Sequence, residues 1–364
     1  MVIPVAAPTR LAPEERAAVR EAVLAVVDAQ QWVLGPSVAR FERELAAYVG
    51  GGEVVGTGNG SDALCLALAS LGVPPGSRVL VPPNDSGFAG QAARAVGLEP
   101  VVHDVDPVTM GPTVELLSAA LVPGTAAVVV THLHGDPLDL VAIDAWRSAE
   151  GLLLVEDCAQ AHGARPDGRH VGRTGDAATF SFYPTKNLAA VGDGGALLLH
   201  DPATAERARS LREYGWGERG SVDHPRGRNS RLDELQAAVL SARLPHLDRR
   251  NARRRALLDR YRKALHGSAT RVHGDPVAGV AHHAVVLDAR RDALREHLHR
   301  AGVGTAVHYP HLTGEMRGIA PRGGRTAVAD RQRHEKLTLP CFPELTDDEV
   351  EAVVAALEAW RDAS

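Results

Sequence analysis

An apolar run ends in two carboxylates at Leu152-Leu153-Leu154-Val155-Glu156-Asp157. An uninterrupted run of this kind is typical of a strand that is buried on both faces of a sheet. A carboxylate at the end of a buried strand needs a cationic or hydrogen-bonding partner, because an unpaired buried charge is costly. We therefore predict a strand here, with Asp157 at its carboxyl end. An acidic residue that only caps the next helix would give the same pattern.

Short apolar runs alternate with helical stretches on both sides of this segment. The runs lie at 53–55, 78–81, 126–131 and 152–155, and the helical stretches between them lie at 62–71, 90–96 and 139–149. This alternation predicts an α/β fold with a mainly parallel central sheet that helices cover on both faces. Ligands of such sheets bind outside the carboxyl ends of the strands.

The composition changes after Pro245, where we place a domain boundary. Residues 1–245 are expected to form a large α/β domain with a helical N-terminal segment, and residues 246–364 a smaller α+β domain. The small domain is predicted to end with a helix at 347–363, because Thr346 and Glu349 form the pattern of a capping box.

The overall composition is that of a globular protein, with 45% hydrophobic and 23% charged residues. A formal net charge of -5 gives no basic field, which disfavours nucleic acid or an anionic membrane as a partner. Cys65, Cys158 and Cys341 are odd in number and widely spaced, as expected for free thiols in a reducing compartment. No stretch approaches the roughly 18 consecutive apolar residues of a membrane span. We therefore predict a soluble, cytoplasmic protein.

A glycine-rich turn follows the run at 53–55 and has the sequence Gly56-Thr57-Gly58-Asn59-Gly60-Ser61-Asp62. The backbone amides of such a turn, with the positive end of the next helix, form a cradle for a phosphate group. A Rossmann fingerprint would need glycine at Ser61, and a P-loop would need lysine followed by serine or threonine, so both nucleotide-binding motifs are disfavoured. A turn that merely begins a helix is the alternative.

Lysine is rare in this chain, which has only Lys186, Lys263 and Lys336. Lys186 lies in Ser181-Phe182-Tyr183-Pro184-Thr185-Lys186-Asn187, just before Gly192-Asp193-Gly194-Gly195. An amine can form a Schiff base with an aldehyde cofactor, whereas a guanidinium keeps its proton. This placement favours a lysine used for its amine, and a surface lysine in a turn is the alternative.

Asp157 and Lys186 each follow an apparent strand, so neighbouring strands could bring them to the same edge of the sheet. One flat cofactor could meet both there. A protonated pyridine nitrogen would give Asp157 its partner and would make the ring an electron sink. Ser181 could then offer its hydroxyl to the phosphate that the turn at Ser61 holds.

Taken together, these residues resemble the DegT/DnrJ/StrS sugar aminotransferases, which use pyridoxal 5'-phosphate and have the aspartate aminotransferase fold (fold type I). The resemblance runs nearly end to end. It is carried by the segments 31–35, 60–64, 156–164, 181–188, 227–238 and 308–310.

The resemblance implies roles for the residues around the cofactor ring. Lys186 corresponds to the lysine that forms the Schiff base and then moves protons between substrate and cofactor. Asp157 corresponds to the partner of the pyridine nitrogen, and Gln160 to the donor to the phenolic oxygen of the ring.

It also implies a phosphate site and a dimer. Gly60, Ser61, Asp62 (through its backbone) and Ser181 correspond to residues around the phosphate. Asn229 corresponds to an asparagine that reaches the phosphate from a second subunit, which implies a homodimer with shared active sites.

The chain departs from the family pattern in two segments. The family places an aromatic ring over the cofactor just after a Pro-x-Asn-Thr segment, whereas this chain has Pro82-Pro83-Asn84-Asp85-Ser86-Gly87-Phe88. We therefore expect Phe88 to stack on the cofactor from a shifted position. His134 replaces the tyrosine of a His-Leu-Tyr-Gly pattern that begins at His132. With His162 these histidines fit no familiar zinc spacing, and no metal site is predicted.

The sugar-nucleotide site is the least specified part of the resemblance. The residues expected to shape it are Trp32, Gly35, His162, His308 and Tyr309. The histidine pairs His282-His283 and His297/His299 fall on the predicted small domain, where we expect them to be exposed.

The function implied is that of a transaminase which moves an amino group, most often from L-glutamate, to a keto-deoxysugar nucleotide. The arginine-rich composition suggests a GC-rich genome and amino-sugar biosynthesis in secondary metabolism. A dehydratase with the same cofactor is one alternative, but such enzymes have histidine in place of Lys186. A non-enzymatic regulator that binds the cofactor or a sugar nucleotide is a second alternative, and an NAD-dependent sugar-nucleotide oxidoreductase is a third.

Overall fold

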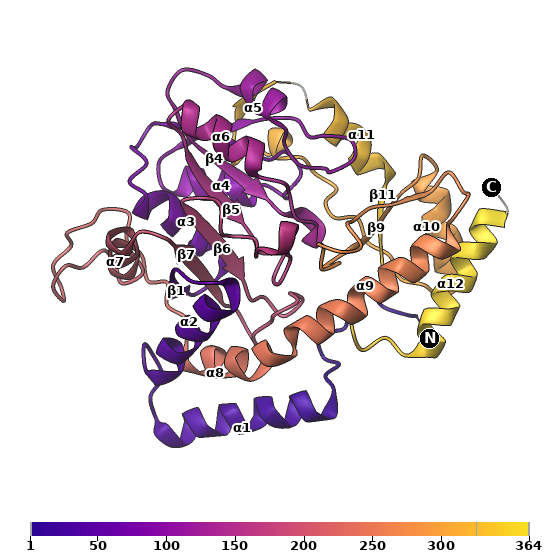
Figure 1. The fold of residues 1–364 in the computed structure, drawn as a ribbon, viewed down its shortest axis with the longest axis horizontal. Helices are drawn as coiled ribbons and strands as arrows, with labels where there is room; N and C mark the ends of the chain where they lie inside the picture. The colour runs from indigo at the N-terminus through magenta and orange to yellow at the C-terminus, as the bar shows by residue number, and fades with distance from the viewer. Residues whose placement is uncertain (1, 325, 363–364) are drawn as a thin grey trace.

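The computed structural model describes residues 2–324 and 326–362. Figure 1 shows a large lobe built around a sheet and a smaller lobe that carries both ends of the chain. The long helix α9 (Leu247–Ala264) runs from the large lobe to the small one. No helix within these residues is long and apolar enough to cross a bilayer.

The large sheet has eight strands in the order β1-β7-β6-β5-β4-β2-β3-β10. Their bounds are β1 (Glu53–Thr57), β2 (Arg78–Val81), β3 (Glu99–Val102), β4 (Thr125–Thr131), β5 (Leu153–Asp157), β6 (Ala177–Ser181), β7 (Gly195–Leu199) and β10 (Arg322–Gly323). β7 is antiparallel to both of its neighbours, and the other pairs are parallel. The predicted α/β class with a mainly parallel sheet is confirmed.

Helices cover both faces of this sheet, as β2 illustrates. Val79 and Val81 are buried with the helices of one face, whereas Leu80 is buried with those of the other, because successive strand residues point to opposite sides. The first face is covered by α3 (Gly60–Ser70), α4 (Phe88–Ala95) and α7 (Pro202–Leu211). The second is covered by α2 (Pro36–Val49), α5 (Val114–Ala120), α6 (Val141–Ala149) and α8 (Glu234–Arg243). Helix α1 (Pro13–Ala29) packs outside α8.

Close backbone approaches set the edge of the sheet where strands β5 and β6 end. Asn59 caps α3, since its side chain accepts a hydrogen bond from the Asp62 amide. A Cβ added to Gly195 would lie 2.4 Å from the Asn59 carbonyl carbon, and one added to Gly60 would lie 2.6 Å from the Cβ of Ser181. These two glycines therefore allow the first turn of α3 to lie directly against the end of β6.

The small lobe contains a three-stranded antiparallel sheet in the order β11-β9-β8. Its elements are β8 (Arg271–Val272), β9 (Ala284–Leu287), α10 (Arg291–Arg300), β11 (Lys336–Leu339) and α12 (Asp347–Asp362), and α11 (Ala327–Glu335) precedes β11. The predicted capping box at the start of α12 is confirmed by reciprocal hydrogen bonds between Thr346 and Glu349, at 3.0 and 3.2 Å. Residue 363 of the predicted helix lies outside the described residues.

The predicted domain boundary falls next to the 3-10 turn η3 (Leu244–His246), which separates α8 from α9. Strand β10 lies beyond this boundary in sequence but joins the large sheet, where Arg322 and Gly323 pair with Val101 and Val102 of β3. The chain therefore returns to the large lobe after α10, before β11 and α12 complete the small lobe.

Candidate active site

A cavity of about 480 Å³ lies at the carboxyl ends of the central strands and reaches the small lobe. Predicted site residues that line it are Gly60, Ser61, Phe88, Asp157, Gln160, Ser181, Lys186, His308 and Tyr309. Segments far apart in sequence thus meet around one cavity, at the edge of the sheet where the parallel strands end.

Asp157 and Lys186 face this cavity from neighbouring strand ends. Asp157 is the last residue of β5, and its carboxylate accepts a hydrogen bond from the amide of Ala159 at 3.0 Å. Lys186 follows β6 in a turn closed by its own amide and the Tyr183 carbonyl. Burial lowers the pKa of Lys186 to about 8, while the charge of Asp157 opposes that change. Burial also raises the pKa of Asp157, which Lys186 opposes in turn.

The first turn of α3 forms one wall of the cavity. Gly60 and Ser61 line it together with Ser181 from the end of β6. Asp62 does not line it: its amide donates to the Asn59 side chain at 2.8 Å, and its carboxylate pairs with Arg228 at 2.8 Å. The predicted phosphate contact of Asp62 remains a prediction.

Gln160 connects the large lobe to the segment that follows the small-lobe helix α10. Its Oε1 accepts a hydrogen bond from the His134 amide at 2.7 Å, and its Nε2 donates to the Tyr309 hydroxyl at 2.9 Å. Burial raises the pKa of Tyr309 to about 12, so the phenol keeps its proton at neutral pH. Phe88, the first residue of α4, places its ring edge-on to Tyr309 with 6.5 Å between ring centres.

Asp85 is a lining residue that the sequence interpretation gave no role. Its carboxylate is buried and accepts hydrogen bonds from the amides of Gly87 and Ala89, both at 2.8 Å, and from the Thr313 hydroxyl at 3.1 Å. Burial raises the pKa of Asp85 to about 6. The sequence signal that could have identified Asp85 is the departure at 82–88, where aspartate stands in the threonine position of the family pattern.

The expectation that His282 and His283 are exposed is wrong. His282 is buried, His283 is partly buried, and both line the cavity beside His308. The rings of His283 and His308 stack with 4.0 Å between their centres. The prediction failed because the small lobe packs its β9 end against the large lobe, and this contact has no local signal in the sequence. On α10, His299 is exposed and His297 is partly buried.

His162 lies outside the cavity lining. Its ring packs against Phe180 and Phe182, with ring centres 5.7 and 5.8 Å away, and its carbonyl accepts a hydrogen bond from Asn251. Asn229 is exposed and also does not line the cavity of its own chain.

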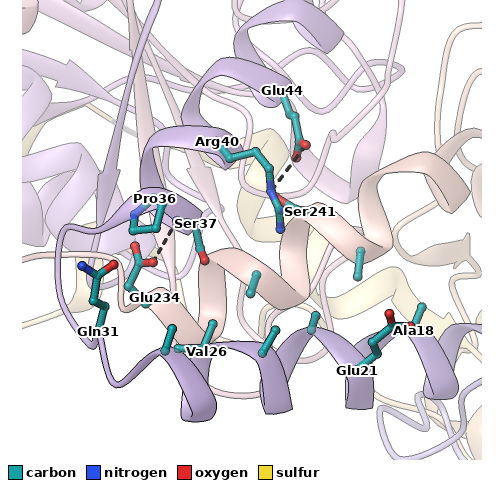
Figure 2. Close-up of a pocket in the computed structure, with 15 residues that line it drawn as sticks. Ala18, Glu21, Val26, Gln31, Pro36, Ser37, Arg40, Glu44, Glu234 and Ser241 are labelled. Carbon is teal, nitrogen blue, oxygen red and sulfur yellow. Dashed lines mark hydrogen bonds and ion pairs between the residues drawn. The ribbon is translucent and has the colours of Figure 1, made fainter.

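Trp32 and Gly35 belong to a different part of the surface. The Trp32 carbonyl accepts a hydrogen bond from the Glu234 amide, and the Glu234 carboxylate accepts one from the Gly35 amide at 2.9 Å. A groove of about 490 Å³ between α1, α2 and α8 begins beside these residues, with Gln31 and Glu234 at one end (Figure 2). It shares no lining residue with the active-site cavity.

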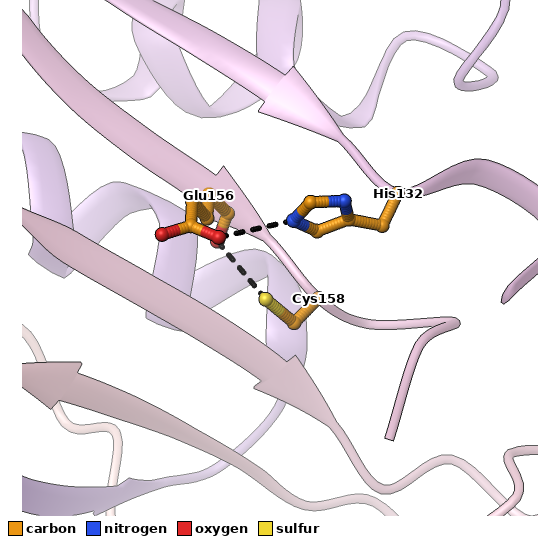
Figure 3. A group of neighbouring side chains, drawn as sticks. All are labelled: His132, Glu156 and Cys158. Carbon is orange, nitrogen blue, oxygen red and sulfur yellow. Dashed lines mark hydrogen bonds and ion pairs between the residues drawn. The ribbon is translucent and has the colours of Figure 1, made fainter. Parts of the chain in front are cut away.

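One group of side chains in the described parts of the chain has metal-ligand spacing: His132, Glu156 and Cys158 (Figure 3). The Leu138 amide donates to Nδ1 of His132, so Nε2 carries the proton and donates to Glu156 at 3.0 Å. Glu156 also accepts hydrogen bonds from the amides of Gly172, Thr174 and Gly175. The carboxylate is thus fully used as an acceptor, and the group anchors the end of β5 next to Asp157.

Residues 13–358 match the DegT/DnrJ/EryC1/StrS aminotransferase family. The chain is 41% identical to the dTDP-3-amino-3,4,6-trideoxy-alpha-D-glucose transaminase of Streptomyces venezuelae, over 96% of this chain and 93% of that protein. It is 42% identical to the erythromycin biosynthesis sensory transduction protein EryC1 of Saccharopolyspora erythraea, over 95% and 96% of the two chains.

Two solved structures extend the comparison to the fold. The structure of S. venezuelae DesV in complex with a ketimine intermediate superposes with a TM-score of 0.94 at 38% identity, over 99% of both chains. NtdA from Bacillus subtilis with bound cofactor PMP superposes with a TM-score of 0.92 at 25% identity, over 99% of this chain and 85% of that one. The predicted aspartate aminotransferase-like fold is confirmed.

Proposed function

The chain belongs to the DegT/DnrJ/EryC1/StrS aminotransferase family, and we propose that it transfers an amino group to the keto group of a nucleotide-linked deoxysugar, with pyridoxal 5'-phosphate as its cofactor. The observation that carries this proposal is the meeting of Lys186 and Asp157 in one buried cavity. The relatives named as dTDP-sugar transaminases support the substrate class.

The cavity lining fits this cofactor. The first turn of α3 offers backbone amides and the Ser61 hydroxyl beside Ser181, which suits a phosphate group. The Asp157 carboxylate suits a protonated ring nitrogen, and the Lys186 amine suits an aldehyde carbon. When bound, the cofactor supplies an electron sink that allows bonds at the amino-bearing carbon of a substrate to be broken and formed.

Lys186 would act as nucleophile and as proton carrier. Its pKa of about 8 leaves an appreciable neutral fraction near neutral pH, and only the neutral amine can attack an aldehyde or accept a proton. Asp157 would keep a neighbouring ring nitrogen protonated. The amide of Ala159 stabilises the ionised form of Asp157 against the cost of burial.

Gln160, Tyr309 and Phe88 would fix and shield the ring. The two hydrogen bonds of Gln160 hold its amide in one orientation at the cavity wall. Phe88 is 42% exposed in the single chain and lies beside the Tyr309 ring, so the two aromatic side chains narrow the opening to solvent.

The amino donor and the sugar site are the finer parts of the proposal. We take L-glutamate as the donor. His308 and Tyr309 line the cavity beside the exposed ring of Tyr183, where a sugar ring could contact them. Trp32 and Gly35 would contribute to the site only at its outer surface, because neither lines the cavity.

A homodimer with shared active sites is also proposed. Asn229 is exposed and does not line the cavity of its own chain, as expected for a residue that completes the site of a second subunit. The exposed aromatic side chains of Phe88 and Tyr183, which line the cavity, support burial of this region by a second copy.

The test is a spectrum of the purified protein loaded with pyridoxal 5'-phosphate. The visible absorbance of the cofactor bound to Lys186 should disappear with L-glutamate and return with a keto-deoxysugar nucleotide. Retention of the absorbance with every amino acid tested would instead favour a binding protein without transaminase activity. Locating the new nitrogen by NMR would then identify the sugar carbon.

A further inference from the structure

A second cavity of about 210 Å³, called the side cavity here, adjoins the active-site cavity. The two share Thr185, His282, His283 and His308. No residue that lines the side cavity is acidic, whereas Asp85 and Asp157 line the active-site cavity. The shared histidines therefore separate a space that is lined by carboxylates from a space that is not.

Arg254, from helix α9, lines the side cavity and is only 5% exposed. Its Nη1 donates to the carbonyl oxygens of Ala281, His282 and Cys341. No described residue accepts a hydrogen bond from its Nε or Nη2, and no described carboxylate forms an ion pair with it. The charge of the Glu344 carboxylate acts on Arg254 through space, but that carboxylate pairs with Arg250. A buried guanidinium with unused donors and no ion-pair partner is suited to an anion that comes from outside the chain.

Lys336 adds a second buried cation to the same region. It is 1% exposed and forms no ion pair within the described residues. It lies two residues before Thr338 on β11, so both side chains point to the same face of the strand. Thr338 lines the side cavity and its hydroxyl lies 3.0 Å from Nδ1 of His308.

A dicarboxylic amino donor brings a second carboxylate, on its side chain, into a site that offers few cations. Among the residues that the structure describes, Lys186 is the only lysine or arginine that lines the active-site cavity, and the proposed function assigns its amine to the cofactor. The side cavity supplies the missing positive charge. Its lining also includes Val5, Ala6 and Leu339, which can pack against methylene groups.

We propose that the side cavity binds the side-chain carboxylate of a dicarboxylic amino donor, with Arg254 as its principal hydrogen-bond donor. This inference rests on the proposed transamination and specifies the chemistry of its first substrate. A short apolar stem that ends in a carboxylate matches the lining, and its binding would select glutamate over neutral amino acids of the same length. A sugar nucleotide is too large for a space of about 210 Å³.

The first experiment compares amino donors with the cofactor-loaded protein. The rate at which the visible absorbance is lost gives kcat/KM for L-glutamate, L-glutamine and L-norvaline, which has the same chain length without the carboxylate. We expect a preference of roughly 100-fold for glutamate over norvaline, as for a charge-assisted hydrogen bond in a buried site. Equal values for the two donors would overturn the proposal.

Variants assign the preference to Arg254. Arg254→Lys and Arg254→Met should lower the glutamate-to-norvaline ratio by roughly tenfold or more, with little change for norvaline itself. The matched control is Arg253→Met. It removes a guanidinium of the same helix, which pairs with Asp347 at the surface. It should leave the ratio unchanged. An equal loss for both donors in the Arg254 variants would show a purely structural role and contradict the proposal.

A second measurement does not depend on turnover. Glutarate should raise the Tm of the cofactor-free wild-type protein, whereas glutaramide, its neutral diamide of the same length, should not, and this comparison decides the case if the Arg254 variants do not fold. Equal effects of the two compounds would contradict the side cavity as a carboxylate site. If no amino acid removes the visible absorbance, the proposed transaminase function is wrong. The effect of glutarate on the Tm still tests the side cavity independently.

Discussion

The amide of Gln160 donates a hydrogen bond to the hydroxyl of Tyr309 at 2.9 Å, across 149 residues of sequence. Gln160 follows β5 in the large lobe, whereas Tyr309 follows the small-lobe helix α10. The contact fixes two side chains of the cavity wall and links the two lobes at the candidate active site.

Tyr309→Phe should lower the free energy of unfolding by about 1–2 kcal/mol, because it leaves the Gln160 amide without this partner in a buried site. Gln160→Leu should cost a similar amount. The double variant should be less destabilised than the sum of the two, as measured by urea unfolding in a double-mutant cycle. Strict additivity would show that the hydrogen bond contributes nothing.

Lys186→Ala should lower transaminase activity by roughly 10³-fold or more, because the variant lacks both the nucleophile and the proton carrier. After borohydride reduction of the cofactor-loaded proteins, mass spectrometry should find the added cofactor mass on Lys186 of the wild type and nowhere in the variant. Lys263→Ala, at the surface of α9, is the matched control and should behave as wild type. A label that stays on the Lys186 variant would refute the assignment.

The rate at which pyridoxal 5'-phosphate adds to the cofactor-free protein should rise with pH, with a midpoint near pH 8, and level off above it. The neutral amine is the reacting form, and burial lowers the pKa of Lys186 to about 8. Asp157 opposes this lowering, so Asp157→Asn should move the midpoint to lower pH. Stopped-flow absorbance between pH 6 and 10 measures both profiles, and a shift to higher pH in the variant would contradict the proposed coupling.

Lys336→Met should stabilise the cofactor-free protein below pH 8 by about 1–3 kcal/mol, since each unit of pKa change corresponds to about 1.4 kcal/mol. Burial lowers the pKa of Lys336 to about 8 from 10.5 in the unfolded chain. The folded state therefore carries its penalty in full below pH 8, and loses it as the pH rises toward 10.5. The difference between variant and wild type should shrink over that range in urea titrations. A difference that is constant with pH would show that Lys336 has no lowered pKa.

Mixing two inactive variants tests the shared active site. If Asn229 completes the site of a second subunit, a mixed dimer with Asn229→Asp on one chain and Lys186→Ala on the other carries both changes in the same site. Refolding Asn229→Asp together with Lys186→Ala should then regenerate one intact site per mixed dimer, about a quarter of wild-type activity. No recovery in a mixture that forms dimers would place both residues in the site of one chain.

The fold could be predicted from local patterns, because each buried strand and each covering helix has its own periodicity. The alternation along residues 53–155 gave the sheet and its layers without tertiary information. Strand β10 could not be found this way, since Arg322 and Gly323 carry no apolar pattern and pair with β3 through the backbone and one ion pair between Arg322 and Glu99. Its position depends on how the small lobe returns the chain to the large one.

The candidate site divides in the same manner. Lys186, Asp157 and Ser61 stand at strand or helix ends, where sequence patterns are informative, and the structure places all three around one cavity. His282 and Arg254 reach the combined cavities through packing between the lobes. Their burial is a property of that packing, and neither charge patterning nor periodicity indicates it.

The pairing of β10 with β3 has a mechanical consequence. The chain is exposed at Arg317 and Gly318, which lie in sequence between α10 of the small lobe and β10 of the large sheet. A protease cut there would leave the C-terminal piece attached through β10 at the edge of the large sheet and through β11, which pairs with β9 along four residues. The nicked protein should therefore run as one particle in gel filtration and as two bands in a denaturing gel.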